Sequence, residues 1–243
     1  MLEKQARRRQ RVFIRRLVGR ILTDRPVKFT AFKETMANAW RPGKGVSMRD
    51  LGGQKFLVQF YHKYDLCRVL DDGPWSFDRN LLLPKRLGSF ESSNQCTLTQ
   101  ATFMIQVHNI PLNLMTSYVA ELIGNYVGIF VSVDENNYKG PVKVFMRVHV
   151  LVDIANPLKQ MMKLRRGKEW VWIEFWYERL PTFCYICGRL GHSDRFCPGH
   201  VGERGSDLSR SYGVCLVGGG YFLKKRKVMG MKVVMGFGLC RFF

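Results

Sequence analysis

Four residues in the last third of the chain have the types and the spacing of metal ligands. Cys184, Cys187, His192 and Cys197 follow the pattern C-x2-C-x4-H-x4-C. Three thiolates and one imidazole fill a tetrahedron around Zn²⁺ and leave no position for a reactive water, so the site is structural. A loop this short depends on the metal for its folding free energy, about 10 kcal/mol or more at neutral pH. We therefore expect one structural Zn²⁺.

The residues between the ligands suit contact with nucleic acid. Gly188 and Gly191 stand where tight ligand loops need permissive backbone angles. Aromatic rings stack on unpaired bases, and guanidinium groups hold phosphates. The candidate nucleic-acid-binding residues are Tyr185, Arg189, Arg195 and Phe196. The alternative is a zinc knuckle that contacts protein.

The charge of the chain points to a polyanionic partner. The formal net charge is +20 and the pI is about 10.0, and such an excess is typical of proteins that bind nucleic acid. Residues 1–20 hold eight Lys or Arg against one acidic residue, and residues 201–243 hold eight against two. The run Leu223–Lys227 is either a nuclear-import or nucleic-acid patch or a solvated basic tail.

Other patterns exclude several classes of protein. No stretch of about 18 apolar residues predicts a membrane span, and the Arg-rich start lacks the apolar run of a secretory signal. We therefore expect an intracellular protein, with the nucleus as one destination, and no membrane partner. The cysteines outside the knuckle share no spacing that would indicate a disulfide framework. They are Cys67, Cys96, Cys215 and Cys240.

An enzyme has little support in the sequence. Asp71 and Asp72 are adjacent and lack a partner acid or base nearby. His108 and His149 lie in apolar strand patterns, which favour satisfied core histidines over catalytic bases. We expect no catalytic residue and no small-molecule substrate.

Residues 17–90 predict an α+β domain that follows a basic segment at 1–16. The order βαββαβ is that of the ferredoxin-like class, which includes RNA-recognition domains, although order alone does not confer their function. The predicted elements are a strand at 17–22, a helix at 29–39, strands at 46–50 and 55–61, a helix at 63–70 and a strand at 80–87.

A second α+β unit is predicted at 102–180, after a polar linker at 91–101. Its elements are a strand at 102–109, a helix at 112–126 and strands at 129–134, 144–154 and 169–178. The knuckle follows at 181–198, and then a Gly-rich basic tail at 199–243 that we expect to be disordered.

Two patterns in this second unit leave alternatives open. The four-residue spacing of Leu114, Tyr118, Leu122 and Tyr126 predicts a stripe that faces the core, with a partner-binding groove as the alternative. The strand Trp170–Tyr177 is aromatic on both faces, which indicates either burial on both sides or a surface that stacks bases.

Several motifs together make the chain recognisable. They are LTDRP at 22–26, AWRPG at 39–43, VLDDGPW at 69–75, IQVHNIP at 105–111, IGNYVG at 123–128 and YERLPTFC at 177–184. In these motifs the chain resembles the plant family called domain of unknown function 4283, followed by the CCHC zinc knuckle found in many retrotransposon-derived proteins. The chain departs from an RNA-recognition domain at Lys55 and Leu57, which stand where stacking aromatics would be expected.

The resemblance implies a gag-like, nucleic-acid-binding role and carries over no catalytic residue. It gives Cys184, Cys187, His192 and Cys197 the role of zinc ligands in nucleic-acid binding. We expect zinc-dependent binding of single-stranded nucleic acid, RNA rather than DNA. The alternative is an assembly or docking module, which includes self-association, in which the knuckle is a structural clip.

Overall fold

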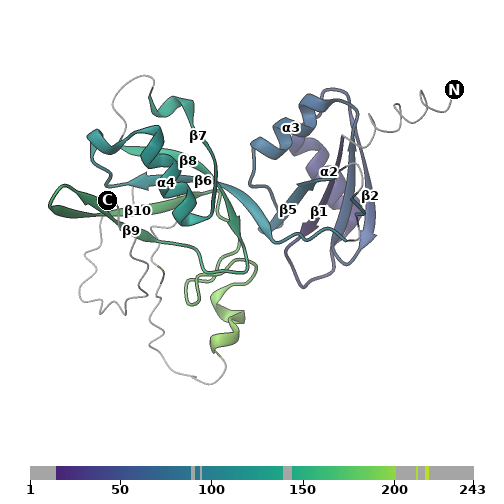
Figure 1. The fold of residues 1–243 in the computed structure, drawn as a ribbon. Helices are drawn as coiled ribbons and strands as arrows, with labels where there is room; N and C mark the ends of the chain where they lie inside the picture. The colour runs from purple at the N-terminus through teal and green to yellow at the C-terminus, as the bar shows by residue number, and fades with distance from the viewer. Residues whose placement is uncertain are drawn as a thin grey trace.

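The computed structural model describes residues 15–88, 91–93, 95–138, 144–200, 212 and 217–218, which form two α+β units and a zinc-knuckle loop (Figure 1). The expectations for the basic segment at 1–16, the run at 223–227 and most of the Gly-rich tail lie outside these residues. Within the described part, no helix has the length and apolar character needed to cross a bilayer.

The first unit has the predicted ferredoxin-like order. Its elements are β1 (Arg16–Ile21), α2 (Phe29–Trp40), β2 (Val46–Gly52), β3 (Lys55–Phe60), α3 (Lys63–Asp71), β4 (Ser76–Phe77) and β5 (Asn80–Arg86). The strands lie in the order β2-β3-β1-β5-β4, and β1 runs antiparallel to both β3 and β5. The short β4, which pairs with β5, was not predicted.

Helices α2 and α3 cover one face of this sheet. In β3 the buried side chains are Phe56, Val58 and Phe60, as expected from alternation along a strand. They pack with residues of α2, and the Phe32 and Phe56 rings lie 4.7 Å apart. Gly19 lies in the middle of β1 because the Phe56 ring occupies the space that a Cβ would need.

The opposite, helix-free face of the first sheet is also buried. Val18, Leu81 and Leu83 are at most 1% exposed and join the core of the second unit. Cys96 and Leu98 pack into the same core, within the segment predicted to be a polar linker. The segment therefore connects the units as packed structure.

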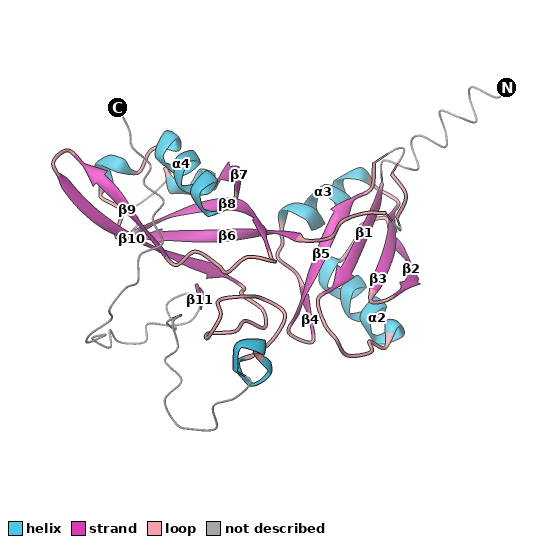
Figure 2. Cartoon of the chain, turned by 60° about the horizontal axis from the view of Figure 1, so that its bottom comes forward, coloured by secondary structure: helices cyan, strands magenta, loops and turns pink. Residues whose placement is uncertain are grey.

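The second unit repeats the strand order of the first. Its elements are β6 (Gln100–His108), the 3-10 turn η1 (Leu112–Leu114), α4 (Ser117–Val127), β7 (Ile129–Val133), η2 (Glu135–Asn137), β8 (Phe145–Asp153), β9 (Met161–Arg166), β10 (Glu169–Glu178) and β11 (Val217–Gly218). The order β10-β6-β8-β7 corresponds to β5-β1-β3-β2, and short β11 lies parallel beside β10. Strand β9, which was not predicted, forms an antiparallel hairpin with β10 at the chain position where the first unit has α3 (Figure 2).

Helix α4 turns a different side to the core from the one predicted. The buried residues are Ala120, Ile123, Gly124 and Val127, whereas Tyr118 is 66% exposed. A four-residue spacing advances by about 40° beyond one helical turn at each step, so the predicted stripe winds off the core face. The side that faces the core is set by the close contact of α4 with β7, since a Cβ on Gly124 would lie 2.7 Å from the Phe130 ring.

Strand β10 has one buried and one partly open face. Ile173, Phe175 and Tyr177 are at most 1% exposed and lie in the core beneath α4. On the other face Trp170 is 52% and Trp172 is 49% exposed. Burial on both faces is therefore wrong for the first half of this strand.

Candidate zinc and nucleic-acid site

The four predicted zinc ligands come together at one point after β10. The ligand atoms of Cys184, Cys187, His192 and Cys197 all lie within 4.8 Å of one another. The Cys187 Sγ and the His192 Nε2 are 3.3 Å apart. Around a tetrahedral Zn²⁺, two sulfurs would be about 3.8 Å apart, and a sulfur and a nitrogen about 3.6 Å. The donor set and its spacing therefore fit a zinc ion.

Backbone hydrogen bonds shape the first half of the loop. The Gly188 N–H donates to the Cys184 carbonyl at 2.9 Å, and the Cys184 N–H donates to the Arg189 carbonyl at 3.0 Å. Gly188 and Gly191 have φ angles of +73° and +94°, which a residue with a side chain adopts at a cost. Both glycines thus have the backbone role expected from the sequence.

Asp194 organises the second half of the loop and was not singled out in the sequence. Its Oδ1 accepts a hydrogen bond from the Tyr185 N–H at 2.7 Å, which ties the two halves together. The 3-10 turn η3 (Asp194–Phe196) follows and leads into Cys197. A carboxylate two residues after a ligand histidine is a weak signal, because many surface residues fit that description.

Burial makes the Cys184 thiolate dependent on a cation. Cys184 is fully buried and Cys197 is 4% exposed. Burial raises the pKa of the Cys184 thiol to about 12, since a thiolate is poorly solvated there. A bound Zn²⁺ would displace this proton and hold the thiolate.

The knuckle is attached to both α+β units. On the side of the second unit, the Leu158 N–H donates to the Gly188 carbonyl at 2.8 Å. On the side of the first unit, the Arg79 carbonyl accepts from the N–H and the Oγ1 of Thr182, at 2.9 and 2.8 Å. Phe183 and Leu190 lie in the shared core. No pattern in the sequence predicts this docking.

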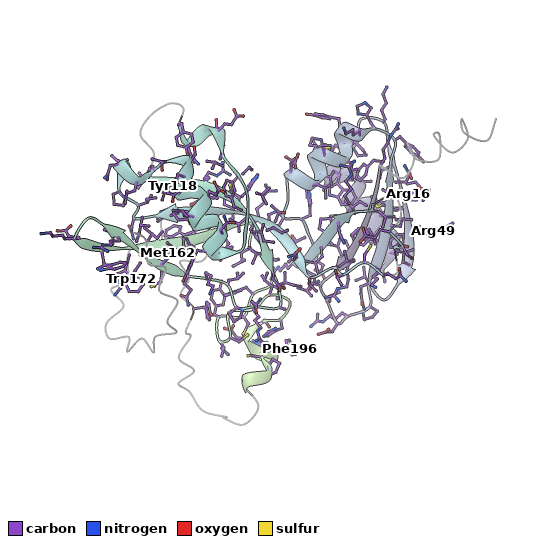
Figure 3. All side chains as sticks on the ribbon, in the orientation of Figure 1. Arg16, Arg49, Tyr118, Met162, Trp172 and Phe196 are labelled. Carbon is purple, nitrogen blue, oxygen red and sulfur yellow. The ribbon has the colours of Figure 1, made fainter. Side chains whose placement is uncertain are left out.

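The predicted nucleic-acid contacts separate into two groups. Arg189, Arg195 and Phe196 are exposed, and Phe196, at 67%, lies on the knuckle at the lower side of the molecule in Figure 3. Tyr185 is half-buried, and its ring meets the Phe183 ring edge-on at 5.1 Å between centroids. Phe196 is therefore the ring best placed to stack on a base.

Two histidines outside the knuckle lie on one face of the second sheet, each beside a different polar side chain. His108 and His149 are half-buried on the helix-free face of the second sheet, which corrects the core positions expected for them. The His108 Nε2 lies 3.0 Å from the Gln106 Oε1, and the His149 Nδ1 lies 3.2 Å from the Ser132 Oγ. Each ring thus has a polar neighbour of its own.

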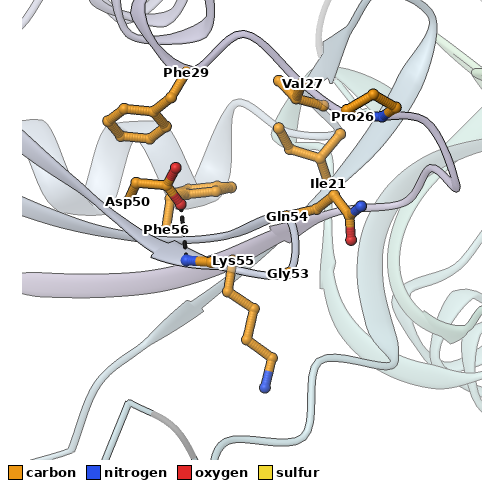
Figure 4. Close-up of a pocket in the computed structure, with 10 residues that line it drawn as sticks. Ile21, Pro26, Val27, Phe29, Asp50, Gly53, Gln54, Lys55 and Phe56 are labelled. Atoms are coloured by element: carbon orange, nitrogen blue, oxygen red, sulfur yellow. Dashed lines mark hydrogen bonds between the residues drawn. The ribbon is translucent and has the colours of Figure 1, made fainter.

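A shallow pocket in the first unit lies between the start of α2 and the β2–β3 turn (Figure 4). Its lining includes Pro26, Val27 and Phe29, with Asp50 and Lys55 as the ionisable residues. The Asp50 Oδ1 accepts from the Gly52 N–H at 2.8 Å and so stabilises the turn. The pocket offers no pair of groups arranged for acid–base chemistry.

Comparison with known families gives two matches, one in each half of the chain. Residues 12–95 match the family described as "Domain of unknown function (DUF4283)", and residues 152–199 match the family described as "Zinc knuckle". The second match begins well before Cys184 and includes β9 and β10, which agrees with a knuckle that packs on this part of the chain. No curated protein matches the chain.

Proposed function

We propose that this chain, a DUF4283 domain followed by a CCHC zinc knuckle, binds single-stranded nucleic acid through its zinc-held loop, and binds RNA in preference to DNA. The observation that carries the proposal is the exposed Phe196 ring beside exposed Arg195, on a loop whose four ligand atoms lie within 4.8 Å of one another. A ring held in this way is preorganised, so little conformational entropy is lost on binding.

The chemistry of the loop favours a single strand. An aromatic side chain stacks on a base only where the base is not already stacked in a duplex. Arg189 and Arg195 supply charge for the phosphates beside such a base. Because phosphate contacts release counterions, binding by this loop weakens as salt rises.

The proposed role is binding without catalysis. Zinc with three cysteines and one histidine has no open position for a substrate, so it supplies only the rigidity of the loop. The resemblance to knuckle proteins of retrotransposon origin supports a gag-like role inside the cell, with the nucleus as one site of action. The proposal includes no enzymatic activity.

A second candidate function has its own observation. The bonds from Leu158 to Gly188 and from Thr182 to Arg79 make the knuckle a clip between the units. In this alternative the zinc loop holds a docking or self-assembly module in shape, and nucleic acid is not its ligand.

Binding of labelled single-stranded RNA, followed by fluorescence anisotropy, distinguishes the two. We expect Phe196→Ala to weaken binding about tenfold, the size of one lost base stack, with zinc content unchanged. Phe196→Tyr keeps a ring and should keep the affinity. Tyr118→Ala, which removes an equally exposed ring on α4, is the matched control.

The docking alternative predicts a different result. Phe196→Ala and an Arg189→Ala/Arg195→Ala double variant would then bind RNA as the unaltered chain does. Removal of zinc would loosen the contact between the units without a direct effect on an RNA site.

A further inference from the structure

The β9–β10 hairpin extends beyond the rest of its sheet. Strand β6 pairs with β10 only over Glu174–Tyr177, whereas β9 pairs with β10 from Glu169 to Glu174. Among the described strands, the first half of β10 therefore has a partner on one side only, and the turn at Gly167 has a φ angle of +60°. This part of the chain projects as a two-stranded ribbon at the left of Figure 1.

Two tryptophans lie opposite two basic residues on one face of this ribbon. In the β9–β10 register, Trp170 is opposite Arg165 and Trp172 is opposite Lys163. The Lys163 Nζ lies 4.9 Å from the centroid of the Trp172 ring. Directly opposed side chains have Cβ atoms about 5 Å apart, so each ring has a cation as its nearest cross-strand neighbour.

The charge of the ribbon differs from that of the adjoining sheet face. There, Arg147 is closed off by ion pairs to Asp134 at 2.6 Å and to Glu178 at 2.7 Å. On the ribbon Lys163 and Arg165 are exposed, and within the described part of the chain neither forms an ion pair. Anions are therefore attracted to the ribbon and not to the centre of the sheet.

We propose that the β9–β10 hairpin is a second contact surface for single-stranded nucleic acid, on which Trp170 and Trp172 stack unpaired bases while Lys163 and Arg165 bind the adjacent phosphates. Residues two apart in a strand are separated by about 6.8 Å, roughly twice the rise between stacked bases. A base on each ring thus requires a strand whose own stacking has opened, which excludes a duplex. The inference shares its ligand class with the proposed function but uses a separate surface.

The pattern favours nucleic acid over a protein partner. Lysine is depleted at the centres of protein–protein interfaces, yet here Lys163 lies against Trp172. The exposed apolar surface is interrupted by a charge in each cross-strand row. Alternating rings and cations are typical of surfaces that track a single strand.

Tryptophan fluorescence in the full-length, zinc-loaded chain tests this surface directly. An oligouridylate of about 20 nucleotides is long enough to cover it and should quench the exposed indoles by stacking. The variant Trp170→Phe/Trp172→Phe should lose most of this quenching but keep its affinity, because phenylalanine also stacks. The variant Trp170→Ala/Trp172→Ala should bind about tenfold more weakly or worse, and Tyr118→Ala should bind normally.

The same titration in a Phe196→Ala background separates this surface from the knuckle. Quenching that persists there supports the hairpin whether or not the knuckle binds RNA. Unchanged affinity of Trp170→Ala/Trp172→Ala in both backgrounds would overturn the inference, as would full quenching in the double phenylalanine variant. A change in oligomeric state with unchanged RNA binding would instead identify a protein-docking surface, and the inference would be wrong.

Discussion

The two α+β units share a strand order but differ in what covers the helix-free face of each sheet. In the first unit that face presents Val18, Leu81 and Leu83, which are buried in the shared core. In the second unit it ends in the β9–β10 ribbon, where Trp170 and Trp172 are about half exposed. The same topology thus yields a face used for packing in one unit and a face partly open to solvent in the other.

The difference shows why strand order alone does not assign function. RNA-recognition domains use the helix-free face of this fold to stack bases. Here Lys55 and Leu57 occupy the corresponding positions of β3, and Leu57 packs against the shared core. The first sheet face is therefore used for packing, and the rings proposed to stack on bases, Phe196, Trp170 and Trp172, lie in the knuckle and the second unit.

Loss of the zinc site should have the largest effect on how the two units contact each other, since the knuckle joins them. Removal of zinc, or Cys184→Ala, is expected to unfold the loop, because structural zinc supplies about 10 kcal/mol of its folding free energy. The amide hydrogens of Leu158 and Thr182, which donate to Gly188 and Arg79, should then exchange faster with deuterium.

Cys67→Ala is the control, because Cys67 lies in α3, outside the metal cluster. If the amide hydrogens of Leu158 and Thr182 still exchange slowly after zinc removal, the two units hold the knuckle in place. The knuckle would then not be what holds the units together. The packing of the first sheet's face and the exposure of the second sheet's face would then not depend on zinc.

Equivalent truncations on the two faces should differ in their cost to stability. Leu83→Ala should lower the free energy of unfolding by about 2–5 kcal/mol, because it leaves a cavity in the shared core. Trp172→Ala should cost about 1 kcal/mol or less, since half of the ring is already in water. Urea denaturation measures both, and equal costs would contradict the contrast between a packed and an open face.

Much of the fold was predictable because local patterns and tertiary structure agree. Alternation in Lys55–Phe60 and the break at Arg41–Gly43 place the elements of the first unit almost to the residue. The ligand spacing from Cys184 to Cys197 is short enough that the loop alone brings the donors together. In both cases the determining interactions are close in sequence.

The rest depends on contacts between distant segments. The side of α4 that faces the core is the one on which Gly124 lies close to Phe130. It is not the side that carries the apolar stripe with four-residue spacing. Strand β9 alternates over only four residues, Met162 to Arg165, and it forms because β10 supplies its hydrogen-bond partners. Tyr185 is half-buried and Phe196 is exposed because Tyr185 packs on Phe183. The spacing of residues in the sequence does not predict that contact.

The dependence of affinity on oligonucleotide length tests whether the knuckle and the ribbon bind the same strand. Strand β10, which leads from one to the other, has ten residues and therefore spans about 33 Å. At the opened spacing of about 6.8 Å per base that stacking on both tryptophans requires, about five nucleotides cover that length. Affinity should rise steeply, by about tenfold to a hundredfold, once an oligouridylate is long enough to reach both surfaces.

The length dependence is measured with a series of oligouridylates and both single-surface variants. In Phe196→Ala and in Trp170→Ala/Trp172→Ala the steep rise should disappear, because only one surface remains. A gradual increase of the same slope in all three proteins would indicate binding by net charge alone.

The smallest expected effect concerns the part of the second sheet's open face that lies between β6 and β10. Burial lowers the pKa of His108 below 6.5, opposed by the charge of Glu174, and the ring stacks on Trp176 at 4.0 Å between centroids. Burial, with Arg147 nearby, also lowers the pKa of His149. The folded protein therefore favours both rings in their neutral form.

This shift makes stability fall on the acid side. The unfolded chain takes up protons first as pH drops through about 6.5, so the stabilisation is complete above that value and is lost progressively below it. The urea midpoint should be lower at about pH 5.5 than at about pH 7.5, and His108→Gln should reduce the difference by removing one of the two groups. Because His108 contacts Trp176, fluorescence should change over the same acidic range in the unaltered chain and not in His108→Gln. An identical pH profile in the variant would mean that the stacked ring is not shielded from water, and that the open character of the ribbon extends across the whole face.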